Sequence, residues 1–168
     1  IFLLMQCCAE IIIMSAFERP LITSSKIEVK QSPLHGWGVF AIEDIEADEI
    51  LDECVFIPCK SWVNNSFAGW KHVEPNLKRY VFSYPKPTRK MIESYPMHKL
   101  SELYRVTYPT LVLGTGSIYN TAKSYAEANA DWDPDDERQL FIFKSIKPIE
   151  NGEEICTFYG ETYWENQA

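Results

Sequence analysis

The five cysteines are the residues whose chemistry is most readily judged from spacing, and they form no metal site. Cys54 and Cys59 are separated by four residues, and no second pair or histidine follows at the spacing of a zinc site. An odd number of cysteines outside a small secreted scaffold favours free thiols in a reducing compartment. We therefore expect an intracellular protein without a structural metal.

Nucleotide-phosphate binding is also not expected from the pattern. No glycine-rich loop follows a strand and opens a helix, which argues against a nucleotide-binding α/β fold. The formal net charge of −8, from 24 acidic and 16 basic side chains, argues against direct binding of nucleic acid. This charge suits a basic partner such as a lysine-rich peptide, through long-range attraction. The alternative is an acidic surface that only keeps the protein soluble.

The elements that would position a site are mostly β-strands. Alternating and continuous apolar runs predict strands at residues 26–32, 39–42, 50–58, 110–113, 139–146 and 155–159. Residues 130–138 (ADWDPDDER) are expected to form an acidic turn, and residues 150–153 a hairpin-type turn. Residues 77–82 are expected to form a short helix or strand that the following prolines end.

The length of 168 residues, with 46% hydrophobic side chains, fits one domain with one core. We assign this domain to residues 26–164, with an insertion at about residues 60–105 and a tail at 165–168. Residues 1–25 are expected to be an N-terminal extension. Because Met14 is suited to be a natural start, residues 1–13 are expected to be upstream translation or dispensable.

The alternative for the first 14 residues is a buried or membrane-lying helix. They are apolar, but Gln6 and Glu10 interrupt them, and they are too short to span a membrane. They also lack the basic start and the cleavage site of a secretory signal. No membrane partner is expected.

Three separated stretches carry a recognisable set of motifs. The first is HGWGVFA at residues 35–41, followed by an acid–isoleucine pair. The second is GSIYN at residues 116–120, followed by Asn129-Ala130, and the third is IKPIENGEEICTFYG at residues 146–160, followed by Tyr163-Trp164. In this order, over residues 26–164, they resemble the SET-domain family of protein lysine methyltransferases.

The resemblance implies a mostly β fold of the β-clip type. Such a fold has small curved sheets, a few short helices and a C-terminal pseudoknot, in which the last segment threads under a preceding loop. Threaded loops are unusual in proteins. The pseudoknot would bring the second and third stretches side by side.

The resemblance also implies an activity, the transfer of a methyl group from S-adenosylmethionine to the ε-amine of a lysine in a basic protein, such as a histone-like protein. Tyr159 matches the family's catalytic tyrosine, and Tyr119 would help to line the lysine channel through its aromatic face. For both residues the alternative is a tyrosine that only packs in the core. A free lysine has a pKa near 10.4, so the site must favour the neutral amine, by desolvation and by the nearby sulfonium charge.

By the same resemblance, the cofactor would contact Gly36, Trp37 and Gly38 through main-chain groups, since glycine lets the backbone approach a ligand closely. Asn120 would hold another part of the cofactor, and Thr121 would lie beside it. For the two glycines and Trp37 the alternative is an ordinary hairpin turn, and for Asn120 it is an asparagine that caps a turn.

The sequence departs from the family pattern in two places. Thr121 and Ala122 stand where histidine and serine are usual, which makes a catalytically inactive module that binds a basic peptide the alternative function. A small all-β domain with an accidental likeness is a third reading. The second departure is the lack of a cysteine-rich zinc segment after residue 164. In this respect the chain resembles small viral or bacterial members of the family. The substrate channel would then be closed by Phe158, Tyr163 and Trp164, by the insertion, or by a second subunit in a homodimer.

Overall fold

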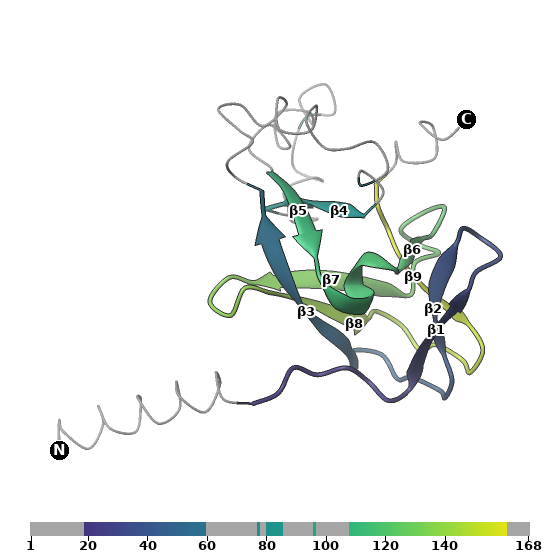
Figure 1. Cartoon of the computed structure of the whole chain (residues 1–168). Coiled ribbons are helices and arrows are strands. Elements are labelled where there is room, and N and C mark those ends of the chain that lie inside the picture. The colour runs from purple at the N-terminus through teal and green to yellow at the C-terminus, as the bar shows by residue number, and fades with distance from the viewer. Residues whose placement is uncertain (1–18, 60–76, 78–79, 86–95, 97–107, 161–168) are drawn as a thin grey trace, which may run out of the picture.

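The computed structural model describes residues 19–59, 77, 80–85, 96 and 108–160 (Figure 1). This part of the chain contains nine strands and one short 3-10 helix. Their bounds are β1 Ile27–Gln31, β2 Trp37–Ala41, β3 Ile50–Pro58, β4 Val81–Tyr84, β5 Tyr108–Val112, η5 Gly114–Ser117, β6 Asn120–Thr121, β7 Ala130–Asp135, β8 Leu140–Ser145 and β9 Glu154–Thr157. No helix among these residues is long and apolar enough to cross a membrane.

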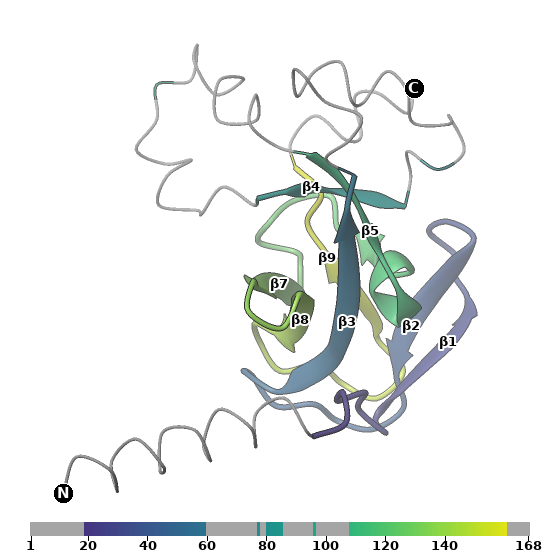
Figure 2. The same cartoon turned by 60° about the vertical axis from the view of Figure 1, so that its left-hand side comes forward.

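The strands form two sheets with the orders β1-β2-β9-β6 and β4-β5-β3-β8-β7. Figure 2 shows the long strand β3 in the middle of the molecule, with β7 and β8 on one side of it and β1 and β2 on the other. The predicted mostly β fold of small curved sheets is therefore confirmed. The described part holds only η5 where a few short helices were expected.

Strand β9 lies between two strands that are distant from it in sequence. It pairs antiparallel with β2, where Val39 faces Ile155, and parallel with β6, where Asn120 faces Cys156. The second and third motif stretches therefore lie side by side, as predicted. This arrangement also places both of them next to the strand that follows the glycine turn.

The hydrophobic core lies between the two sheets and is rich in aromatic rings. Phe141 and Phe143 of β8 are fully buried, and the Trp132 ring stacks on Phe141 with 4.1 Å between ring centroids. Burial of one such side chain stabilises a protein by roughly 1.5–3 kcal/mol. The core therefore gives a rigid support to the edge of the sheets that carries the motifs.

Two local predictions were wrong. Residues 130–135 form strand β7 at the edge of the larger sheet, so only residues 136–139 form the predicted acidic turn. Ala130 and Trp132 alternate with polar side chains and pack in the core, and Pro134 is tolerated because an edge strand leaves some amide positions unpaired. Residues 150–153 do turn, but the strands on either side belong to different sheets and form no hairpin.

The middle of the chain was predicted least clearly. Of residues 77–82, predicted to be a helix or a strand, the last two begin strand β4, which pairs with β5 at the other edge of the larger sheet. Most of the proposed insertion at residues 60–105 lies outside the described residues, as do residues 1–13 and the tail.

Candidate active site

The amide of Asn120 joins the glycine turn to the two strands behind it. Its Nδ2 atom lies 3.2 Å from the carbonyl oxygens of His35 and Trp37, and 2.7 Å from Oε1 of Glu154. Its Oδ1 atom makes no hydrogen bond to a residue of the described part of the chain. Asn120 therefore holds the turn by its nitrogen and leaves its oxygen able to accept a hydrogen bond from a ligand.

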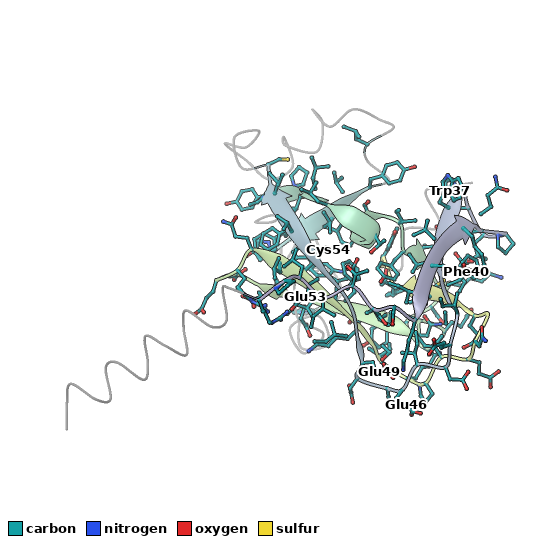
Figure 3. The ribbon with its side chains drawn as sticks, turned by 60° about the horizontal axis from the view of Figure 1, so that its bottom comes forward. Trp37, Phe40, Glu46, Glu49, Glu53 and Cys54 are labelled. Atoms are coloured by element: carbon teal, nitrogen blue, oxygen red, sulfur yellow. The ribbon has the colours of Figure 1, made fainter. Side chains whose placement is uncertain are left out.

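The side chain of Trp37 lies at the outer edge of the site. It is 59% exposed, and Figure 3 shows it at the opposite end of β2 from the loop that carries Glu46 and Glu49. These two acidic residues are therefore remote from the site. The ring of Trp37 is accessible to a ligand that binds against the turn.

The two glycines of the turn are required for different physical reasons. Gly36 has a φ of +54°, a conformation that strains residues with a side chain, and the position of its missing Cβ is open. At Gly38, a Cβ would lie 2.3 Å from Oε1 of Glu154. Gly38 is therefore needed to make room for a carboxylate of this protein, a reason that its sequence motif does not reveal.

Tyr159 is fixed at both its main chain and its side chain. Its N–H donates to Oγ1 of Thr121 over 3.1 Å, and its hydroxyl donates to the main-chain carbonyl of Tyr119. Its half-buried ring lies 6.4 Å from the ring of Phe82, measured between centroids. The phenol is thus held against β6 and the residue before it, and two oxygen atoms meet at its tip.

Tyr119 contributes its main chain, whereas its side chain lies in the core. The ring is fully buried and stacks on Phe143 with 4.7 Å between centroids. Burial, and then the negative charge of Asp52, raise the pKa of this phenol well above its usual value. The Tyr119 side chain thus packs in the core, which is the placement that the alternative interpretation expected. The oxygen that accepts the hydrogen bond of the Tyr159 hydroxyl is the Tyr119 main-chain carbonyl.

Thr121 also faces Tyr159. It is 4% exposed, and its hydroxyl donates to the carbonyl of Ala122 over 3.1 Å while it accepts the N–H of Tyr159. The residue that stands in place of a histidine thus positions the candidate catalytic tyrosine through a side-chain hydrogen bond. Only its main chain remains for the predicted contact with a cofactor.

We expect Thr121→Val to destabilise the fold locally, because the valine keeps the shape of threonine but cannot accept the Tyr159 N–H. An unsatisfied buried donor costs about 1–3 kcal/mol. Thr121→Ser, which keeps the hydroxyl, is the matched control and should lose less. Urea denaturation and hydrogen exchange of the Tyr159 amide measure the two effects. Equal protection of that amide in the two variants would contradict this role.

The remaining predicted channel residues lie away from the tip of Tyr159 or outside the described residues. Phe158 packs against a small cluster of Ala122, Ala128 and Cys156, and its ring meets that of Tyr125 edge-on at 6.2 Å. Tyr163 and Trp164 lie outside the described residues.

Within the described part of the chain, the ring of Phe82 in β4 approaches that of Tyr159, although no prediction from the sequence named Phe82 as a site residue. It also meets the rings of Trp132 and Phe143 edge-on, at 5.4 and 6.2 Å. No motif marks this phenylalanine. Only the pairing of β4 with β5 brings it to the site.

Asn129 secures β9 from the side. Its Nδ2 donates to the carbonyl of Glu154 over 2.9 Å, and its Oδ1 accepts the N–H of Cys156 over 2.8 Å. The main-chain N–H of Asn129 donates to the carbonyl of Cys156 over 3.2 Å. Asn129 thus acts as a strand partner for the segment that carries Tyr159.

The two buried thiols of the described residues are not suited to act as nucleophiles. Cys54 and Cys156 are free and buried, and burial, followed by the charge of Glu154, raises the pKa of the Cys156 thiol to about 12. A thiol with so high a pKa is a poor nucleophile near neutral pH. Within the described ranges, no group of three or more histidine, cysteine or acidic side chains is placed to hold a metal.

Comparison with known proteins relates this geometry to a family. The model of the SET domain matches residues 36–160, which contain all three motif stretches except His35, the first residue of the first stretch. Among solved structures, the chain is similar to a protein of Plasmodium falciparum that carries a provisional assignment as a histone methyltransferase. The identity is 24%, the match covers 84% of this chain and 98% of that one, and the TM-score is 0.50, so it supports the fold alone. No curated protein matches the chain.

Proposed function

Because the chain belongs to the SET-domain family of protein lysine methyltransferases, we propose that it moves a methyl group from S-adenosylmethionine to the ε-amine of a lysine in a basic protein. The observation that carries the proposal is the placement of Tyr159. Its hydroxyl and the Tyr119 carbonyl meet beside the ring of Phe82, at the place where the second and third motif stretches lie side by side. Two oxygen atoms therefore lie next to an aromatic ring, an arrangement that is suited to bind a lysine side chain.

The residues present are suited to hold the cofactor, whose sulfonium group supplies the methyl. Asn120 offers Oδ1 as an acceptor, Trp37 offers an accessible ring, and Gly36 and Trp37 lie exposed at the surface of the turn, whereas Gly38 is buried behind them. The imidazole that usually helps to shape the pocket is replaced by Thr121, so the adenine would depend on main-chain contacts there. We propose these residues as the cofactor-binding set.

The chain's own groups would act on the lysine in two ways. The oxygens of Tyr159 and Tyr119 would orient the amine and accept weak CH···O contacts from the transferred methyl. The apolar surroundings of Phe82 would favour the neutral amine, because burial lowers the pKa of lysine. Holding the amine in line with the methyl group would supply much of the rate enhancement, since orientation converts a bimolecular encounter into a unimolecular step.

A basic protein, such as a histone, is the substrate that the net charge of −8 supports. We propose that no nucleic acid is bound directly. We also propose that the free buried thiols reflect an intracellular location. The domain would extend over residues 26–164, and Phe158, Tyr163, Trp164 or a second subunit would close the channel.

A second candidate function is a SET-fold module that binds a basic peptide without catalysis. The hydrogen bond from the Tyr159 N–H to the Thr121 hydroxyl supports it. A histidine usually stands at this position and helps to shape the cofactor pocket, whereas the side chain of Thr121 binds another residue of the same chain. The two functions differ in whether a methyl group is transferred to the bound peptide.

The experiment that tests the proposal has two arms. Calorimetry with S-adenosylhomocysteine, the demethylated cofactor, measures binding, and transfer of labelled methyl groups to core histones and lysine-rich peptides measures activity. We expect binding in the micromolar range typical of enzyme ligands, and label on at least one basic protein. Binding of the cofactor and of basic peptides without transfer of label would favour the second function. If S-adenosylhomocysteine does not bind, the enzymatic proposal is overturned.

A further inference from the structure

Glu154, the first residue of β9, connects the three parts of the site. Its Oε2 accepts a hydrogen bond from the hydroxyl of Ser32 over 2.8 Å, and its Oε1 accepts one from Asn120 over 2.7 Å. The side chain is half-buried, and no lysine or arginine of the described ranges forms an ion pair with it. This carboxylate is therefore held by neutral donors from two segments that are distant in sequence.

Ser32 is the residue that organises the glycine turn. Its N–H donates to the carbonyl of Gly36 over 2.8 Å, and its hydroxyl oxygen accepts the N–H of Leu34 over 2.9 Å. The absence of a side chain at Gly38 leaves the space that the Glu154 carboxylate occupies. The position of the turn and the position of this carboxylate are thus coupled.

The carboxylate also determines which way the amide of Asn120 faces. An ionised carboxylate can only accept hydrogen bonds, so it attracts the Nδ2 side of the amide and repels the oxygen. The carbonyl oxygens of His35 and Trp37 also accept hydrogen bonds from Nδ2, but they carry no net charge. A hydrogen bond to a charged acceptor is the strongest of the three, so Glu154 dominates the orientation.

We propose that Glu154 is a positioning residue for the cofactor: it fixes the amide of Asn120 with the oxygen directed to the ligand. The inference rests on the proposed function, because it assigns Asn120 and the turn to S-adenosylmethionine. It gives a role to a residue that appears in the sequence analysis only as a member of the third motif stretch. Loss of Glu154 should act on cofactor binding through Asn120, and leave the binding of the peptide unchanged.

Three variants separate positioning from general stability. Glu154→Ala removes the charged acceptor of the Asn120 amide and leaves only the two main-chain carbonyls. Glu154→Gln is the conservative rescue, because its amide oxygen can still accept from Asn120 while its NH2 donates to the Ser32 hydroxyl. Ser32→Ala removes the other hydrogen bond of the carboxylate, but it keeps the Ser32 N–H that holds the turn at Gly36 and leaves Asn120 in place.

Calorimetry with S-adenosylhomocysteine, on variants shown to be folded by circular dichroism, is expected to give a Kd about tenfold higher for Glu154→Ala than for the wild type. Tenfold corresponds to about 1.4 kcal/mol, close to the range measured for a hydrogen bond to a charged group. Glu154→Gln and Ser32→Ala should stay within about threefold of the wild type. The KM for S-adenosylmethionine should rise in Glu154→Ala, and the KM for the peptide should not.

A readout without cofactor is the side-chain amide of Asn120 in a ¹⁵N–¹H spectrum. We expect its signals to shift and its protons to exchange faster in Glu154→Ala, with little change in Ser32→Ala. If Glu154→Ala does not fold, Glu154→Asp replaces it, since the shorter side chain keeps the charge but withdraws the carboxylate from the amide of Asn120.

Wild-type affinity in Glu154→Ala, or in Glu154→Asp where that variant replaces it, overturns the inference and leaves the proposed function intact. If Ser32→Ala loses as much affinity for S-adenosylhomocysteine as the Glu154 variant does, the inference is also overturned. Glu154 would then only stabilise the fold at this place. Failure of the wild type to bind S-adenosylhomocysteine overturns both the inference and the proposed function.

Discussion

Tyr159→Phe is expected to lower the rate of methyl transfer by about a hundredfold while S-adenosylhomocysteine still binds. The variant keeps the ring beside Phe82 but removes the hydroxyl that meets the Tyr119 carbonyl. The amine then loses one of the two oxygens that would align it, and small misplacements of reacting groups cost on the order of a hundredfold in rate. Single-turnover transfer of a labelled methyl group measures the effect apart from product release.

Tyr119→Phe is the matched control for this experiment. It removes a phenol that is fully buried in the core and leaves in place the main-chain carbonyl that Tyr159 contacts. We expect a change in stability with a much smaller change in rate. A rate as low as that of Tyr159→Phe would instead support the predicted role of the Tyr119 side chain in the lysine channel. A Tyr159→Phe variant with the wild-type rate would remove the basis of the proposed mechanism.

Asn129→Ala is expected to produce the largest loss of stability among the variants considered, about 3 kcal/mol in the free energy of unfolding. The substitution leaves the N–H of Cys156 and the carbonyl of Glu154 without their side-chain partner. An unsatisfied buried group costs about 1–3 kcal/mol, and two are created at once. Because β9 leads directly to Tyr159, the folded fraction of the variant should also show a less protected Tyr159 amide.

Urea denaturation measures the loss, and Ser124→Ala is a suitable control. Ser124 lies in the same loop, and its hydroxyl bonds only the exposed Glu127 side chain and nearby main chain. Surface substitutions of this kind usually change stability by no more than about 0.5 kcal/mol. If Asn129→Ala changes the unfolding free energy as little as Ser124→Ala does, the contacts of Asn129 do not secure β9.

Strands with regular side-chain alternation could be predicted from the sequence. Ile50–Pro58 was assigned without any knowledge of its partners, and its second half does alternate between buried and exposed residues, whereas residues 51–54 are all buried. Residues 130–135 were missed because three aspartates and a proline resemble a turn in composition. The alternation of Ala130 and Trp132 with polar residues carried the correct signal, and an edge strand tolerates the proline that obscured it.

The partners of β9 could not be inferred from periodicity, because strand pairing between distant segments leaves no local pattern. The resemblance to a family supplied that pairing. It did not reveal that Tyr119 meets Tyr159 through its carbonyl, since a sequence does not show which atoms of a residue face a site. Glu154 and Phe82 were missed for the same reason: each gains its place only from contacts with remote segments.

The central position of β9 has a consequence for how the protein is made. The hydrogen bond between Ser32 and Glu154 joins residues 122 positions apart, and that between Asn120 and Trp37 joins residues 83 positions apart. Contacts of such long range slow folding, because a long loop must close before they form. During synthesis the ribosome must release β9 before the glycine turn acquires its carboxylate. A nascent chain that ends before residue 154 would therefore lack the assembled pocket, even if its other strands had already paired.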